Sequence, residues 1–188
     1  MNLTSKILGL ALGAMASVIP ASAQDSKAFH VGLNVTYAND GLYNITHKYD
    51  GFGAELGYTG KLANTAVPFR TTLSFQNFAG EKFDTQKQSL TGVQLAGDLL
   101  INTGADRLRI ITGISVNQWN LKYDPSLPPG TKDPAKGTKF GARLGLDYGF
   151  SDSWSGSFMI QVTELGTTPG ATTGVNPSWL QAGLKYHF

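Results

Sequence analysis

The sequence predicts an all-β fold, in which eight antiparallel strands close into an up-and-down β-barrel. Three observations predict it. Apolar and polar residues alternate with a period of two in eight segments, the connections between these segments are alternately long and short, and no stretch after residue 23 shows a sustained helical period. An even number of strands that closes on itself leaves no exposed sheet edge.

The eight predicted strands share one design, with apolar residues on one face and small or polar residues on the other. In FHVGLNVTY (29–37), Phe29, Leu33 and Tyr37 are among the residues of the apolar face. The pattern is most regular in FGARLGLDYGF (140–150), where every second residue is apolar. The remaining segments, in chain order, are FGAELGYT (52–59), FRTTLSFQ (69–76), TGVQLAGDLLI (91–101), LRIITGISVNQ (108–118), WSGSFMIQV (154–162) and SWLQAGLKYHF (178–188).

The connections also alternate in length. Long ones follow the first, third, fifth and seventh strands and cover 38–51, 77–90, 119–139 and 164–178. Short ones follow the second, fourth and sixth strands and cover 60–68, 102–107 and 151–153. This arrangement predicts long loops at one end of the barrel, and short turns with both chain termini at the other end.

The polar face decides between a soluble barrel with an apolar interior and a transmembrane barrel with an apolar exterior. Along each strand this face carries few charges and many Gly, Ser, Thr, Gln and Asn residues, which suit a narrow interior better than a soluble surface. Aromatic residues gather on the apolar face near the short turns, as in an interfacial girdle: Phe29, Tyr58, Phe69, Tyr148, Phe150, Trp154, Tyr186 and Phe188. We therefore predict a transmembrane β-barrel, with a secreted, lipocalin-like barrel as the alternative.

The first 23 residues read as a cleaved secretory signal peptide. Lys6 is followed by the apolar run 7–19 and then by Ala21-Ser22-Ala23, a small-x-small cleavage pattern. An uncleaved membrane anchor is the alternative, but the run is short for a spanning helix. The predicted organisation is a signal peptide at 1–23 and a barrel domain at 24–188.

The inward face of the predicted barrel carries single charges of both signs. An isolated charge in such a space is costly, so we expect these residues to pair and fill the lumen. The alternative is a narrow pore that opens when the charges change partners. The expected lumen charges are Glu55, Arg70, Asp98, Arg109, Arg143, Asp147 and Lys185.

The signal peptide, the eight alternating strands and the aromatic ending together resemble the small outer-membrane barrels of Gram-negative bacteria. These include the transmembrane domain of outer membrane protein A, outer membrane protein X and the opacity-type proteins. The resemblance implies an outer-membrane location with periplasmic termini. It also implies that Tyr186 and Phe188 form the signal read by the barrel assembly machinery. The expected role is structural or in surface interaction, such as adhesion or recognition, and the alternative is a narrow channel for small solutes or ions.

The resemblance also bears on partners. It implies a monomer in contact with outer-membrane lipid and lipopolysaccharide. Lipopolysaccharide is anionic and would be contacted by the loop lysines Lys122, Lys132, Lys136 and Lys139. An extracellular ligand or host surface is expected as a further partner. The 15 basic and 13 acidic residues are nearly balanced and show no sign of nucleic-acid binding.

Catalysis, a cofactor and a metal are not expected. Some barrels of this kind modify lipid A, for which the resemblance would require a histidine with a serine nearby, close to the outer surface. His30 and His187 are expected near the periplasmic end, and His47 lies in the first long loop without a His-x-Ser motif. Three scattered histidines and no cysteine do not make a metal site.

Overall fold

A computed structural model describes residues 27–39, 42–43, 46–61, 67–80, 82–83, 86–124, 137–164, 166–167, 174–175 and 178–188. The predicted signal peptide lies outside these residues. Eight long strands make the barrel: β1 (Phe29–Ala38), β2 (Asp50–Lys61), β3 (Pro68–Phe78), β5 (Gln86–Asn102), β6 (Leu108–Asp124), β7 (Thr138–Gly149), β8 (Trp154–Thr163) and β11 (Ser178–His187).

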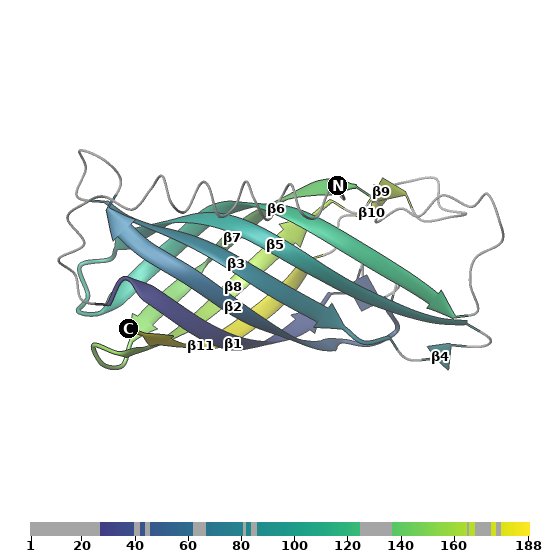
Figure 1. The fold of residues 1–188 in the computed structure, drawn as a ribbon, viewed down its shortest axis with the longest axis horizontal. Helices are drawn as coiled ribbons and strands as arrows, with labels where there is room; N and C mark the ends of the chain where they lie inside the picture. The colour runs from purple at the N-terminus through teal and green to yellow at the C-terminus, as the bar shows by residue number, and fades with distance from the viewer. Residues whose placement is uncertain are drawn as a thin grey trace.

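All neighbouring long strands are antiparallel, and the sheet closes. Its order is β3-β2-β1-β11-β8-β7-β6-β5, and a further pairing of β3 with β5 joins the two ends. The first and last strands lie side by side, with Leu33 opposite Leu184. Figure 1 shows the resulting tilted cylinder, with the C-terminus and the short turns at one end. The predicted eight-stranded barrel is confirmed.

Two strands are longer than predicted. The fourth predicted strand was expected to begin at residue 91, but β5 begins at Gln86. The fifth was expected to end at residue 118, but β6 ends at Asp124, and both strands contain 17 residues. Beyond the last β3 pair (Phe78 with Leu90) and the last β7 pair (Gln118 with Thr138), they continue to pair with each other. Those residues were wrongly assigned to loops. Residues 86–89 carry no apolar alternation, whereas the alternation of Trp119, Leu121 and Tyr123 in β6 was overlooked.

Short elements lie in the long connections. β4 (Lys82–Phe83) pairs with the start of β5, and β9 (Gly166–Thr167) pairs with β10 (Gly174–Val175). Helical geometry among the described residues is limited to one turn around Leu42, where the Asn39 carboxamide oxygen accepts a hydrogen bond from the Leu42 N–H. Within the part of the chain that the structure describes, no helix is long and apolar enough to cross a membrane.

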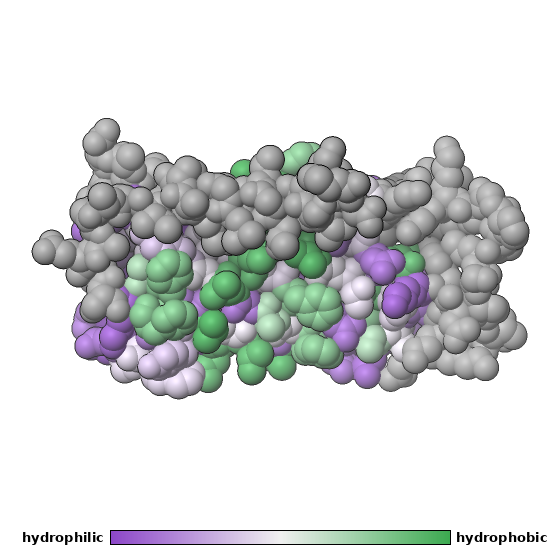
Figure 2. All heavy atoms as spheres, viewed as in Figure 1, coloured by the Kyte–Doolittle hydropathy of each residue, from purple (hydrophilic) through white to green (hydrophobic). Residues whose placement is uncertain are grey.

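The outer face of the barrel is apolar over its middle. Leu33 and Ile114 are 71% and 74% exposed, although such side chains are normally buried in a protein that water surrounds. Figure 2 shows hydrophobic side chains gathered over the middle of the visible face, with hydrophilic ones toward the two ends. The polar residues that alternate with them along the strands are buried inside the cylinder.

Candidate functional site in the barrel interior

Six charged side chains meet inside the barrel, toward the end with the short turns. We call them the charge cluster: Glu55, Arg70, Asp98, Arg143, Asp147 and Lys185. Each is at most 7% exposed. They come from five strands, β2, β3, β5, β7 and β11, because the period of two turns every second residue inward. Three cations and three carboxylates make the cluster electrically balanced.

Arg70 is the centre of the charge cluster. Its guanidinium donates hydrogen bonds to Asp98 Oδ2, from Nε at 3.3 Å and from Nη2 at 3.2 Å, and to Asp147 Oδ1 from Nη1 at 3.0 Å. Lys185 Nζ donates to the same Asp147 oxygen at 3.2 Å and lies 3.8 Å from Glu55 Oε1. Arg143 Nε lies 3.6 Å from Asp98 Oδ1. Each buried charge therefore has an opposite charge within 4 Å.

Arg109 does not join the charge cluster, although the sequence predicted that it would. Arg109 is the second residue of β6 and points inward. In the register it lies opposite Asp147 of β7. The Asp147 oxygen Oδ1 is already occupied by Arg70 and Lys185. Arg109 is left half-buried at the mouth of the barrel, without an ion pair to any described residue.

Glycines opposite the large inward side chains make room for them. Gly32 faces Glu55, Gly57 faces His30 and Gly113 faces Asp98 in the register. A Cβ on Gly113 would overlap Asp98 Oδ1 and would lie 2.5 Å from the backbone oxygen of Gly97, which cannot move aside without disturbing the sheet. The abundance of glycine is thus explained in part by the packing of the lumen.

Gly113→Ala is expected to lower the free energy of unfolding by about 1–3 kcal/mol, because overpacking displaces Asp98 from its cationic partners. Urea unfolding of the refolded barrel in lipid vesicles measures this change. Gly149→Ala is the matched control, because its Cβ would meet nothing closer than 3.6 Å. An equal effect in the two variants would contradict the proposed role of Gly113.

Two histidines lie beside the charge cluster at the turn end. The rings of His30 and His187 are 5.5 Å apart between centroids, and His30 Nε2 lies 3.7 Å from Glu55 Oε1. His187 Nε2 is 2.8 Å from the Ser155 hydroxyl. This pair was not predicted, because the two residues are 32 positions apart in the sequence. No described carboxylate is hydrogen-bonded to the other ring nitrogen of His187, so this Ser–His pair lacks the acid of a catalytic triad. Within the described residues, no three potential metal ligands gather.

A belt of amides crosses the lumen above the charge cluster. Gln94 donates to Asn117 Oδ1 at 2.7 Å, and Asn117 donates in turn to Thr163 at 3.1 Å. On the opposite side, Gln181 accepts hydrogen bonds from Gln76, at 3.4 Å, and from Gln161. All six residues are at most 2% exposed. Because amides both donate and accept, they can fill this level without carrying a net charge.

The interior is apolar at the loop end, which sequence reasoning missed. We call this group the apolar plug: Ala38, Leu42, Phe78, Leu90, Trp119, Leu121 and Trp179. The rings of Trp119 and Trp179 meet edge to face at 5.7 Å, and Phe78 lies 5.6 Å from Trp179. Six of the seven have the inward parity of their strands; five of them lie one to three residues beyond the predicted segments, and Trp179 lies within one. Following the parity of each strand to its true end would have found them.

The expected girdle residues lie on the outer face near the short turns. Phe29 stacks on Phe188 at 6.3 Å, Phe188 on Tyr186 at 6.4 Å, and Tyr186 contacts Trp154 at 5.1 Å. Tyr148 and Phe150 form a further pair, and Phe69 is half-buried. Tyr58 differs from the exposed members, because its ring packs against Phe29 and over the missing side chain of Gly60, which leaves it only 5% exposed.

The two expected assembly-signal residues differ in their contacts. Tyr186 belongs to β11, whereas Phe188 lies just past its end but still exchanges two backbone hydrogen bonds with Phe29, at 2.9 and 3.3 Å. The pairing between the first and last strands therefore continues to the last residue. A second set of exposed aromatics, not predicted, lies toward the loop end and includes Tyr37, Phe52 and Phe140.

Comparisons with known proteins agree with this fold. The profile of the family described as "Outer membrane protein beta-barrel domain" matches residues 8–188. Neisserial surface protein A is 14% identical, with a TM-score of 0.57, and the match covers 85% of this chain and 97% of that one. A search of curated proteins finds no match.

Two further solved structures are similar. The N-terminal β-barrel domain of Pseudomonas aeruginosa OprF is 14% identical, with a TM-score of 0.52, and covers 87% of this chain and 98% of that one. Ail, the attachment invasion locus protein of Yersinia pestis, was solved in complex with the heparin analogue sucrose octasulfate. That structure is 8% identical, with a TM-score of 0.54, and covers 86% of this chain and 97% of that one. At these identities the likeness concerns the fold.

Proposed function

The chain belongs to the outer membrane protein β-barrel domain family, and from this premise we propose that it is a closed barrel that displays a recognition surface outside the cell. In this proposal residues 1–23 are removed on export, the short turns and both termini lie in the periplasm, and the long connections face outward. Aromatic side chains on the outer face toward both ends are suited to the two lipid interfaces, and the apolar band between them to the hydrocarbon layer.

The observation that carries this proposal is the hairpin of β5 and β6. These strands have 17 residues each, whereas β1, β8 and β11 have 10. From Gln118 to Asp124, β6 extends past its last pair with β7, which is roughly 20 Å of strand at the rise of an antiparallel sheet. Figure 1 shows the two strands reaching beyond their neighbours at the end opposite the C-terminus. Such a projection is not needed to close the barrel.

The residues at and after the projecting end of β6 favour an anionic partner. Residues 119–139, which run from this end of β6 to the start of β7, contain four lysines, Lys122, Lys132, Lys136 and Lys139, and only two acidic residues, Asp124 and Asp133. Clustered lysines attract sulfated or phosphorylated polysaccharides. The complex of Ail with a heparin analogue provides a precedent on this fold for such a ligand. We therefore propose that the hairpin recognises an anionic polysaccharide.

The contents of the lumen support a closed barrel over the alternative of a narrow channel. The charge cluster fills one level with paired side chains, and the apolar plug fills another with two tryptophans and a phenylalanine. Between them lies the hydrogen-bonded amide belt. A passing ion would have to break buried ion pairs and then cross a level that is lined mainly by apolar side chains, and both steps are unfavourable.

The double variant Lys132→Gln/Lys136→Gln is expected to weaken binding to immobilised heparin by about tenfold or more, because it removes two of the four lysines in residues 119–139. Both lysines follow β6 in the sequence, so the pairing of β5 with β6 is kept. Surface plasmon resonance with the detergent-refolded protein measures the affinity. Deletion of 168–173, an uncharged segment of another long connection, is the control. Equal affinity in the Lys132→Gln/Lys136→Gln variant and the wild type would refute the proposal.

A further inference from the structure

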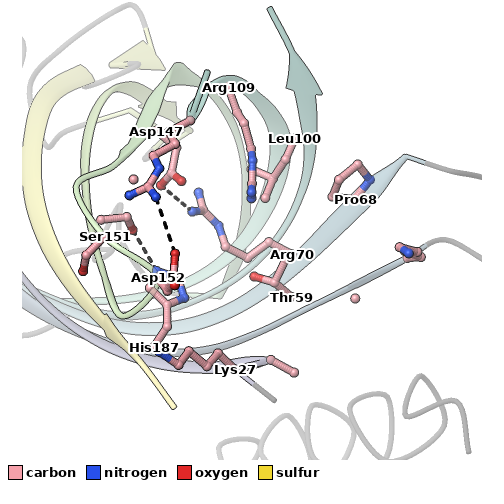
Figure 3. Close-up of a pocket in the computed structure, with 16 residues that line it drawn as sticks. Lys27, Thr59, Pro68, Arg70, Leu100, Arg109, Asp147, Ser151, Asp152 and His187 are labelled. Atoms are coloured by element: carbon pink, nitrogen blue, oxygen red, sulfur yellow. Dashed lines mark hydrogen bonds and ion pairs between the residues drawn. The ribbon is translucent and has the colours of Figure 1, made fainter. Parts of the chain in front are cut away.

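A cavity of about 400 Å³ opens at the mouth of the barrel where the short turns lie. We call it the mouth cavity. Its walls come from the ends of β2, β5, β7 and β11 and the beginnings of β3, β6 and β8, and Arg70 and Asp147 of the charge cluster lie at its floor. Figure 3 shows the side chains of Arg109, from β6, and Arg70, from β3, pointing into the same space. The mouth cavity plays no part in the proposed recognition by the hairpin.

The mouth cavity has more positive than negative charge. Its lining includes five cations, Lys27, Lys61, Arg70, Arg107 and Arg109, but only two carboxylates, Asp147 and Asp152. Those two carboxylates are already paired, Asp147 with Arg70 at 3.0 Å and Asp152 with Arg107 at 3.6 Å. The floor beneath adds no net charge, because the charge cluster is balanced. Three cations therefore remain.

None of these three cations has a carboxylate within 4 Å among the described residues. The Lys27 side chain donates a hydrogen bond to the Ser153 hydroxyl at 2.6 Å. The side chains of Arg109 and Lys61 line the cavity and form no hydrogen bond or ion pair with a described residue. In a concave space with low-dielectric walls, charges of one sign reinforce each other and attract a counter-ion. Arg109 is the most enclosed of the three and offers planar, paired donors that match an oxyanion.

Neutral hydrogen-bonding groups lie beside these cations. Ser155 and His187, hydrogen-bonded to each other at 2.8 Å, both line the mouth cavity. The volume suffices for a diphosphate or a small phosphate ester, which is larger than a monatomic ion. A ligand with several negative oxygens could contact Arg109 and Lys61 together.

We propose that the mouth cavity binds a phosphate-bearing oxyanion, with Arg109 and Lys61 as its principal contacts. The ligand is either a soluble phosphate compound in the compartment that the turn end faces or the headgroup of an anionic phospholipid. The proposal rests on the cavity and its unpaired cations, and it holds whether or not the hairpin binds a polysaccharide.

Isothermal titration of inorganic pyrophosphate into the full-length barrel in phosphatidylcholine nanodiscs tests the proposal. We expect saturable binding that weakens as salt is added, and a loss of affinity of about tenfold or more in the double variant Arg109→Gln/Lys61→Gln. The matched control is Lys122→Gln/Lys139→Gln, which removes two cations at the opposite end of the barrel. All four side chains are at least partly exposed, so we expect both variants to fold. Heat-modifiable gel mobility checks that each variant is folded.

A second arm distinguishes the two sources of phosphate. If nanodiscs that contain phosphatidylglycerol abolish pyrophosphate binding, the headgroup occupies the cavity. If pyrophosphate binds equally in both lipids, the ligand is a soluble compound. Both results support the proposal. Absence of saturable binding in phosphatidylcholine, or undiminished affinity in the folded Arg109→Gln/Lys61→Gln variant, would overturn it.

Discussion

Arg70→Met is expected to lower the free energy of unfolding of the barrel by about 3–5 kcal/mol, the range for a buried ion pair that loses one partner. Arg70 is 1% exposed and donates three hydrogen bonds to Asp98 and Asp147. Methionine has a similar length but no charge, so the change leaves an excess of negative charge in an enclosed space. Asp98 would keep only Arg143, at 3.6 Å, and Asp147 only Lys185.

Arg107→Met is the matched control. Arg107 also pairs with an aspartate, Asp152, but the two side chains are 47% and 84% exposed. Exposed pairs contribute little, so the control is expected to change the stability by no more than about 1 kcal/mol. Urea titration of both variants in phosphatidylcholine vesicles, followed by tryptophan fluorescence, measures the difference. Equal stabilities would mean that the charge cluster does not hold the barrel together.

Deletion of Phe188 is expected to remove most of the folded protein from the outer membrane. Phe188 exchanges two backbone hydrogen bonds with Phe29 at the seam between the first and last strands, and its ring stacks on those of Phe29 and Tyr186. In addition, we propose that Tyr186 and Phe188 form the signal that the barrel assembly machinery reads. The loss should therefore exceed what the burial of one half-exposed ring contributes to stability.

The amount of heat-modifiable protein in outer-membrane fractions measures this loss. Phe188→Tyr keeps the backbone bonds and an aromatic ring, and we expect it to assemble like the wild type. Phe150→Ala removes a ring of similar exposure, 58% against 51%, away from the seam, and we expect it to assemble well. Normal levels of folded protein without Phe188 would show that assembly does not depend on this residue.

The fold could be predicted from the sequence because a period of two leaves its trace in every strand. The alternation of the segments 140–150 and 154–162 identified both the strands and the face that turns inward. Parity also placed Glu55, Arg70 and Lys185 on that inward face. It could not say which charges meet, because this depends on how far each strand is shifted along its neighbours. Arg109 shows this limit of the sequence pattern. Its inward orientation was predicted correctly, but its position along the barrel axis puts it in the mouth cavity and not in the charge cluster.

The apolar plug and the hairpin escaped prediction for a different reason. An inward face was expected to be polar throughout. Trp119 was therefore assigned to a long connection, and Trp179, although inside the predicted strand 178–188, was not recognised as a lumen residue. Residues 86–89 of β5 carry no apolar alternation. In β6, Trp119, Leu121 and Tyr123 do continue the alternation, but they were assigned to the long connection that follows. The pair of Ser155 and His187 became visible only when the register of β8 and β11 brought them together.

We propose that side chains close the barrel at two levels, the charge cluster and the apolar plug. Recording from the purified, refolded protein in a planar lipid bilayer tests this closure, with a known porin as a positive control for insertion. We expect a baseline without conductance steps in 1 M KCl, although heat-modifiable mobility shows the same preparation to be folded. Discrete, reproducible conductance steps from the folded protein would contradict it.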